Sequence, residues 1–179
     1  MKAVETIKEF FRRRSLRRHA STEPTGIVPL RDVRSAVAFI DVEDPSFDQC
    51  KNALLLFFRE RGIKGEVFFF DFRKLSDGER LITSITTTVL RKDLNWFGKP
   101  SREKVDLLLQ GEPDLFLSLL PKAGFPLSFM ASCSRARFKV GREQLPGDIF
   151  DLVVKDAADR PLSQVEAFRE IVKFLDKIQ

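Results

Sequence analysis

Hydrophobic residues form two kinds of pattern that alternate along the chain. Short, nearly continuous apolar runs at residues 35–40, 63–70 and 114–120 are typical of strands that are buried on both faces of a parallel sheet. Apolar residues that recur every three or four positions, at 46–61 and 163–178, predict amphipathic helices. Strands that alternate with helices indicate βαβ units and an α/β fold.

Other segments extend this pattern less regularly. Residues 81–90 (LITSITTTVL) are rich in β-branched side chains and predict a third strand, and 149–155 predicts another. Residues 101–110 and 127–134 predict short helices, and 73–80 a polar turn or a short helical piece. We therefore predict a three-layer α/β sandwich around a mostly parallel sheet of five or six strands, Rossmann-like or flavodoxin-like, in which one edge strand could be antiparallel.

Residues 135–140 alternate between charged and apolar side chains. Arg135, Arg137 and Lys139 share one face, which predicts a strand with one solvated face. Together with Arg142 they could form an anion-binding patch, or they could simply protect an edge strand from unwanted pairing.

Two helix starts carry the signature of a capping box. Ser46 is followed three residues later by Gln49, and Ser163 by Glu166. In a capping box each side chain hydrogen-bonds the backbone N–H of the other residue. The pattern therefore predicts where the first and last helices of the domain begin.

The positive charge is concentrated in residues 1–20. This segment has seven basic and two acidic residues, and so carries the whole formal net charge of +5. We predict three parts: a basic amphipathic arm (1–20), a linker (21–34) and one α/β domain (35–179). The arm could attach to an anionic surface, either lipid headgroups or RNA, or pack its apolar stripe on the domain. The basic side chains for such attachment are Arg12, Arg13, Arg14, Arg17 and Arg18.

The composition excludes several classes of protein. The chain has 179 residues, 43% hydrophobic and 32% charged, which is typical of one globular domain. No apolar run is long enough to cross a membrane, and the start lacks the apolar core of a signal peptide. We expect a cytoplasmic protein, with peripheral attachment to the inner membrane surface as an option.

The sequence contains none of the common motifs for nucleophilic catalysis, zinc binding or phosphate binding. The single His19 lies in the arm, which leaves no His in the domain for nucleophilic catalysis or for a Cys/His zinc site. Cys50 and Cys133 are read as buried structural residues, with a disulfide left open. Neither common phosphate-binding loop occurs. We predict no catalytic residue, no metal and no cofactor.

Polar residues that follow predicted strands are the candidates for ligand binding. In parallel sheets, ligands bind at the carboxyl ends of strands, and these positions hold Asp41, Asp71, Asp93, Asn95, Trp96 and Lys99. The aromatic ring of Trp96 beside amide and ammonium groups could hold a planar ligand. The carboxylates could alternatively form turns or bind Mg²⁺, and the Trp96 loop could be a hydrophobic plug.

Three motifs together resemble a known family. Residues 93–100 (DLNWFGKP), 113–119 (PDLFLSL) and 125–142 (FPLSFMASCSRARFKVGR) are similar to those of an uncharacterised family of small bacterial α/β proteins, and the likeness covers roughly residues 35–179. The resemblance implies the α/β sandwich and brings no assigned activity.

A second, local resemblance concerns residues 113–119 and 134–142. They resemble a strand–helix segment in the N-terminal Rossmann-like domain of heptosyltransferase-type glycosyltransferases. Ser118 stands where that pattern has an acidic residue, and these 179 residues hold no counterpart of the second, sugar-nucleotide-binding domain.

Two functions follow as hypotheses. The first is a non-enzymatic binding module that docks on an anionic surface through its arm. The alternative is a protein that binds a small ligand or a nucleotide sugar, related in descent to glycosyltransferases. Enzymatic activity and oligomeric state stay open.

Overall fold

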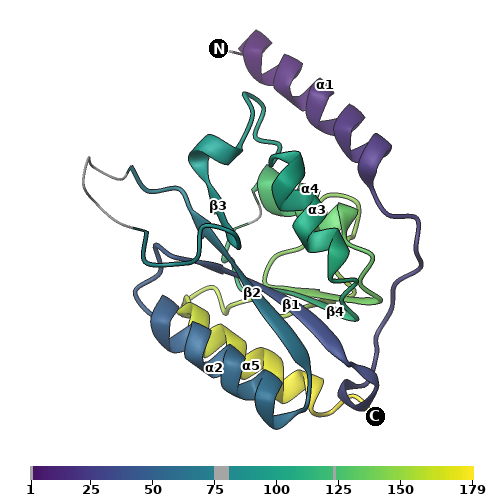
Figure 1. The fold of residues 1–179 in the computed structure, drawn as a ribbon, viewed down its shortest axis with the longest axis vertical. Helices are drawn as coiled ribbons and strands as arrows, with labels where there is room; N and C mark the ends of the chain where they lie inside the picture. The colour runs from purple at the N-terminus through teal and green to yellow at the C-terminus, as the bar shows by residue number, and fades with distance from the viewer. Residues whose placement is uncertain (1, 75–80, 123) are drawn as a thin grey trace.

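A six-stranded parallel sheet forms the centre of the protein (Figure 1). The computed structural model describes residues 2–74, 81–122 and 124–179. The strands lie in the order β3-β2-β1-β4-β5-β6, and their described pairings are all parallel. Because the order reverses direction between β1 and β4, the switch point of the sheet lies there. The strands are β1 (Ser35–Asp41), β2 (Lys64–Asp71), β3 (Thr88–Leu90), β4 (Leu115–Ser118), β5 (Phe138–Gly141) and β6 (Leu152–Val153).

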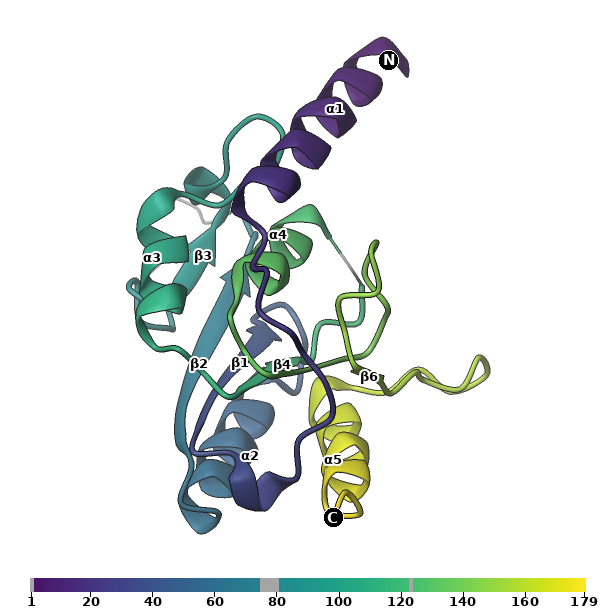
Figure 2. The same ribbon diagram turned by 90° about the vertical axis from the view of Figure 1, so that its right-hand side faces the viewer.

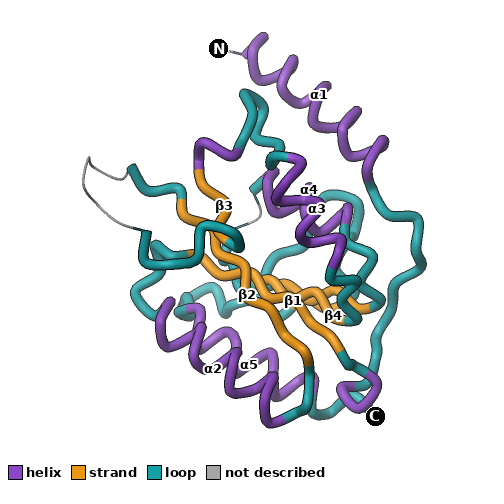
Figure 3. Tube along the Cα trace, viewed as in Figure 1, coloured by secondary structure: helices purple, strands orange, loops and turns teal. Residues whose placement is uncertain are grey.

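Helices cover both faces of this sheet (Figures 2 and 3). On one face lie α2 (Phe47–Glu60) and α5 (Gln164–Leu175), and on the other α3 (Arg102–Gln110) and α4 (Phe125–Cys133). Helix α1 (Lys2–His19) lies outside these layers, beyond α4, and its first half projects from the domain. Two 3₁₀ turns, η1 (Leu30–Asp32) and η2 (Arg91–Asp93), complete the described elements. The predicted three-layer α/β fold is thus confirmed.

The core has one layer on each side of the sheet. In the layer under α3 and α4, Phe39 stacks between Phe68 and Phe116, with ring centroids 5.2 and 4.9 Å away. Cys50 belongs to the opposite layer, whereas Cys133 belongs to this one. Both thiols are free and separated by the sheet, so the disulfide left open by the sequence does not form. Burial raises the pKa of Cys50 to about 12 and that of Cys133 to about 11.

The strands on the outer parts of the sheet are shorter than predicted. Of residues 81–90 only the last three form β3, and of 149–155 only two form β6. Residues 85–87 form a turn, because β-branched side chains favour a strand only where a neighbouring strand pairs with them. No strand of the described sheet is antiparallel, and most of the turn predicted at 73–80 falls outside the described residues.

The predicted solvated face at residues 135–140 is wrong for Lys139. Strand β5 lies between β4 and β6 and is not an edge. Lys139 is only 4% exposed, and its Nζ donates to the carbonyl oxygen of Ala131 at the end of α4 (2.8 Å). Burial lowers the pKa of this lysine, although Asp151 opposes the shift. The alternation also placed the start of the strand too early, because β5 begins at Phe138 and residues 135–137 precede it.

Of the two predicted capping boxes, one is confirmed. The Ser163 hydroxyl and the Glu166 carboxylate bond each other's backbone N–H at the start of α5. Ser46 makes no capping bond to its own helix. Its hydroxyl instead donates to Asp44 (2.6 Å) and accepts from the N–H of Val165 (3.2 Å), which ties the start of α2 to the start of α5.

The segment between α1 and β1 runs along the domain (Figure 2). The N–H of Ser21 donates to the carbonyl of Ser132 (2.7 Å), and that of Gly26 to the carbonyl of Arg137 (2.9 Å). The hydroxyl of Thr25 donates to Asp151 (2.8 Å). These bonds hold the predicted linker against the end of α4 and the start of β5.

Candidate functional site

Helix α1 rests on the domain through one side of its second half. Ser15 is buried, and the rings of His19 and Phe129 lie 5.6 Å apart. The guanidinium of Arg12 lies 5.3 Å from the ring centroid of Phe125, and its Nε donates to the carbonyl of Phe97 (2.8 Å). Helix α4 and residues 94–100 are therefore the surface that α1 contacts.

The apolar stripe of α1 points elsewhere. Val4, Ile7, Phe10 and Phe11 are exposed by 55, 51, 58 and 40%. At 100° per residue, positions 4, 7 and 11 lie about a quarter of a turn away from positions 12, 15 and 19, which face the domain. Most of the stripe is therefore exposed rather than packed on the domain, although Phe11 contacts the rings of Trp96 and Phe97.

Positive side chains continue the line of the apolar stripe. Positions 4, 7, 11, 14 and 18 follow one another at intervals of three and four residues, which places Arg14 and Arg18 on the same face as Val4 and Phe11. Arg14, Arg17 and Arg18 are exposed and make no ion pair within the described residues. Arg13 pairs with Glu9 (3.0 Å), and Arg12 with Glu5 (3.1 Å). The predicted arginines thus divide into two that are paired and three that are free to contact a partner.

Residues 94–100 form a tight loop beside this stripe. Leu94 and Pro100 form an antiparallel bridge, and the side-chain oxygen of Asn95 accepts from the N–H groups of Phe97 (3.2 Å) and Lys99 (2.9 Å). Gly98 has φ +91°, a conformation that other residues rarely adopt. The loop is therefore held by its own hydrogen bonds, with Trp96 near its tip.

Trp96 meets α1 at Phe11. The two rings make an edge-to-face contact with centroids 5.3 Å apart, and Phe97 stacks on Phe11 at 5.9 Å. Trp96 stays 57% exposed. The ammonium of Lys99 lies over the ring of Phe129 (5.2 Å). We call Val4, Ile7, Phe10, Phe11 and Trp96 the apolar surface.

The carboxylates at the strand ends already have partners. Both oxygens of Asp71 accept from Arg73 (2.8 and 2.7 Å), which lowers its pKa. Asp41 accepts from the N–H of Glu43 (2.8 Å), and burial raises its pKa, helped by the nearby Asp44 and Asp71. Asp93 accepts from the N–H of Leu90 (2.8 Å). Among the described residues, no group of acidic, His or Cys side chains is arranged to hold a metal ion.

The structure brings together only part of the predicted ligand set. Asp41 and Asp71 lie at the carboxyl edge of neighbouring strands, whereas Trp96 and Lys99 lie at α1 and α4. A pocket of about 550 Å³ opens at Asp71, lined also by Arg73, Leu81, Leu90, Arg91 and Lys92. Neither Asp41 nor Trp96 lines it.

Buried side chains bridge the switch point between β1 and β4. Gln164, which has no exposed surface, accepts from the N–H of Asp41 (2.7 Å) and donates to its carbonyl (2.8 Å). Arg142 donates to the carbonyl of Leu119 at the end of β4 (3.1 Å) and to Asp156 (2.6 Å). The loop after β1 also carries Glu43 and Asp44. These bonds occupy the place where ligands of such folds bind, and the acidic loop disfavours phosphate there.

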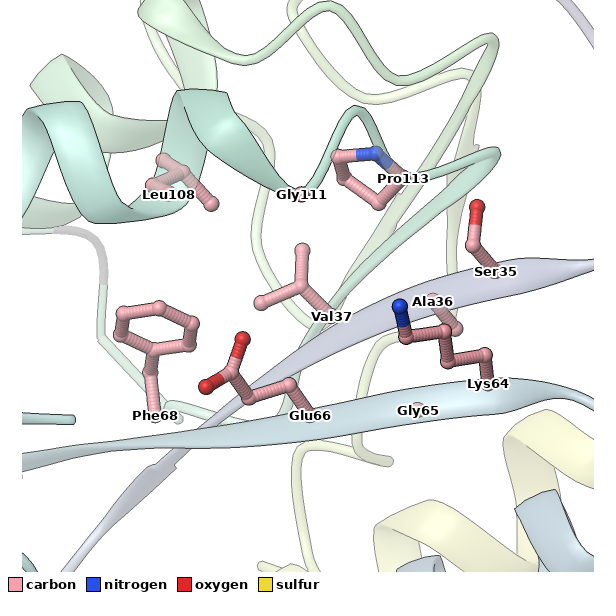
Figure 4. Close-up of a pocket in the computed structure, with 10 residues that line it drawn as sticks. All are labelled: Ser35, Ala36, Val37, Lys64, Gly65, Glu66, Phe68, Leu108, Gly111 and Pro113. Carbon is pink, nitrogen blue, oxygen red and sulfur yellow. The ribbon is translucent and has the colours of Figure 1, made fainter.

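A second pocket, of about 330 Å³, lies at the opposite, amino edge of the sheet (Figure 4). Its floor is apolar, with Val37 and Phe68 pointing toward Leu108 of α3. Lys64 and Glu66 stand at its side on β2. Sequence reasoning did not find this pocket, because it depends on where α3 ends above the sheet.

Three features of the candidate site carried no signal in the sequence. They are the contact between Phe11 and Trp96, the buried hydrogen bonds of Gln164, and the burial of Arg142. Each joins residues that lie far apart in the chain. Only the exposed arginines and the aromatic loop, which are local features, were available to sequence reasoning.

Within the described residues, none of the helices has the length and apolar character of a membrane span.

No curated protein and no solved structure matches the chain. The family model "Family of unknown function (DUF6913)" matches residues 8–178. This match agrees with the resemblance to an uncharacterised family and carries no support for the glycosyltransferase likeness. Because it covers nearly the whole chain, including most of α1, the protein belongs to the DUF6913 family.

Proposed function

We propose that the protein is a binding module that attaches reversibly to an anionic membrane surface through α1. The observation that supports this most directly is the exposure of the apolar stripe of α1, while the neighbouring side of the helix is held by the domain. A helix with exposed apolar side chains and arginines can lie in a membrane interface, apolar groups in the acyl boundary and cations at the headgroups.

The apolar side chains favour lipid over RNA as the partner. Aliphatic groups such as Val4 and Ile7 gain about 0.8 kcal/mol per buried CH₂ in an apolar layer, and phosphates offer no such environment. The arginines would contact either partner. Near an anionic bilayer each basic residue contributes about 1 kcal/mol, so the three unpaired arginines would add about 3 kcal/mol.

The test is co-sedimentation of the full chain with vesicles of equal parts phosphatidylcholine and phosphatidylglycerol, at low salt. We expect binding that weakens with added salt and is much weaker on pure phosphatidylcholine. The variant Arg14→Gln/Arg17→Gln/Arg18→Gln should lower the affinity about 100-fold, which is what about 3 kcal/mol implies.

A matched control removes the same charge elsewhere. Arg31, Arg59 and Lys64 are exposed and make no ion pair within the described part of the chain, so Arg31→Gln/Arg59→Gln/Lys64→Gln should bind nearly as the unaltered chain does. Equal losses in both variants would mean that net charge alone acts. Binding to RNA but not to vesicles would replace the membrane with a nucleic acid.

A further inference from the structure

We propose that residues 94–100 are a second membrane-contacting element, in which Trp96 enters the lipid headgroup region beside Phe11. This inference rests on the membrane attachment of α1 proposed above. It adds a second contact point, 85 residues from Phe11 in the chain, and with it a defined orientation of the domain.

The apolar surface is continuous from α1 to Trp96. Phe10 and Phe11 contact each other at 5.6 Å, and Phe11 contacts Trp96 at 5.3 Å. Trp96 keeps more than half of its surface exposed despite this contact. A bilayer that receives the apolar side of α1 would therefore reach Trp96 as well.

The loop of residues 94–100 is already held in place before any membrane binds. Its turn is fixed by Asn95 and by the bridge between Leu94 and Pro100. Arg12 links it to α1 through the carbonyl of Phe97. Because the loop and the helix are joined before binding, attachment would not require ordering either of them, and less free energy is lost on association.

Tryptophan has the chemistry of a membrane-interface residue. Its indole is large and apolar with one N–H donor, and it concentrates at membrane–water interfaces, where one end meets lipid and the other water. The arginines that continue the stripe of α1 would meet the lipid phosphates at the same depth. An anionic phospholipid bilayer fits the arginines, Trp96 and the aliphatic Val4 and Ile7 together, whereas RNA could stack its bases on Trp96 but would leave Val4 and Ile7 in water.

Contact through both α1 and Trp96 would set the orientation of the domain on the membrane. A helix that lies alone in the interface leaves the attached domain free to rotate about the helix axis. A second contact at Trp96 would fix that rotation and keep the α4 side of the domain toward the membrane. The sheet would then have one orientation relative to the bilayer.

The test uses the intrinsic fluorescence of the full chain. Trp96 is the only Trp and the chain has no Tyr, so emission excited at long wavelength reports this residue alone. With anionic vesicles we expect a blue shift, protection from iodide, and quenching by lipids brominated near the headgroup end of the acyl chain.

Variants separate the second element from the first. Trp96→Ala should weaken vesicle binding about tenfold, and Trp96→Phe should restore most of it. The control Phe174→Ala removes an aromatic residue of similar exposure (47%) from α5, on the other face of the sheet, and should bind normally.

The outcomes distinguish the two proposals. If the chain sediments with vesicles while Trp96 emission and iodide quenching stay unchanged, α1 attaches alone and the second element is refuted. Failure to sediment at all overturns both proposals. A blue shift that grows with protein concentration without lipid would show that a second copy covers the apolar surface, which also overturns this one.

Discussion

Asp114 shows how a single side chain can join three segments of the chain. Its carboxylate accepts from the N–H groups of Arg34 (2.8 Å) and Ser35 (3.1 Å) and from the guanidinium of Arg137 (3.1 Å). Burial alone would raise its pKa, but these partners together lower it below the ordinary value of 3.8. The residue thus fixes the start of β4 against the start of β1.

Replacing this carboxylate should make stability less dependent on acid pH. Because the pKa is lower in the folded state, the stabilisation is complete above the unfolded value of 3.8 and disappears as pH falls through the folded value. Asp114→Asn should therefore lower the free energy of unfolding by about 2 kcal/mol at neutral pH and by less in acid. Urea unfolding of both proteins at several pH values measures this difference in the free energy of unfolding.

The control for that series is Asp159→Asn, since Asp159 is exposed and outside this cluster. It should leave both the stability and its pH dependence nearly unchanged. Parallel pH curves for Asp114→Asn and the unaltered chain would contradict the role given to Asp114.

At the scale of elements, the packing of α2 on β2 depends on one small residue. A Cβ added to Gly65 would lie 2.0 Å from the ring of Phe58, closer than side chains allow. Phe58 belongs to the apolar side of α2, which the helical period predicted. Gly62 ends α2 with a φ of +64°, a conformation for which a glycine after a helix is a local signal, but nothing local marked Gly65.

We expect Gly65→Ala to destabilise the fold by about 1–3 kcal/mol, as overpacking does. Thermal or denaturant unfolding measures the loss. Gly26→Ala is the matched control, because nothing lies within 4 Å of that position. Adding Phe58→Leu to the Gly65 variant should recover part of the loss, and a fully stable Gly65→Ala protein would show that α2 can move aside freely.

At the scale of the whole molecule, Arg142 holds the segment that leads to α5 against the end of β4. It is 4% exposed and donates to the carbonyls of Leu119 (3.1 Å) and Leu162 (2.8 Å) and to Asp156 (2.6 Å). These partners lie at the end of β4 and in the segment that leads to α5. One guanidinium with several donors in a fixed plane can join three such groups, which a lysine cannot.

Arg142→Met should lower the free energy of unfolding by about 3 kcal/mol. It leaves two carbonyls without this donor, and the partly buried carboxylate of Asp156 keeps only the N–H of Leu162. Denaturant unfolding would show this, with Arg142→Lys in between. The control is the exposed Arg135, whose ion pair with Glu112 is long (3.7 Å) and exposed. Arg135→Met should lower the free energy of unfolding by less than about 1 kcal/mol. Equal effects of the two Met variants would mean that Arg142 is not a tie between these segments.

The predictions from sequence succeeded where the pattern is local. Strands β1, β2 and β4 and helices α2, α3 and α5 lie within their predicted ranges, or within one residue of them. The shortfall is in the short strands β3 and β6, in the start of β5, which lies three residues later than predicted, and in the environment of Lys139. Pairing partners and neighbouring helix ends decide these features, and they come from distant parts of the chain.

The sequence by itself determined the α/β class, the start of α5 at Ser163, and the concentration of positive charge in residues 1–20. Periodicity, capping residues and charge are properties of short segments, so they can be read from them. Only the tertiary structure decided the strand order, the bridging of the switch point by Gln164 and Arg142, and the side of α1 that faces the domain. A helical stripe shows which residues share a side but not which side is buried, because that depends on the surface packed against it. Here Arg12 and Ser15 face the domain, and Phe11 and Trp96 are left outside together.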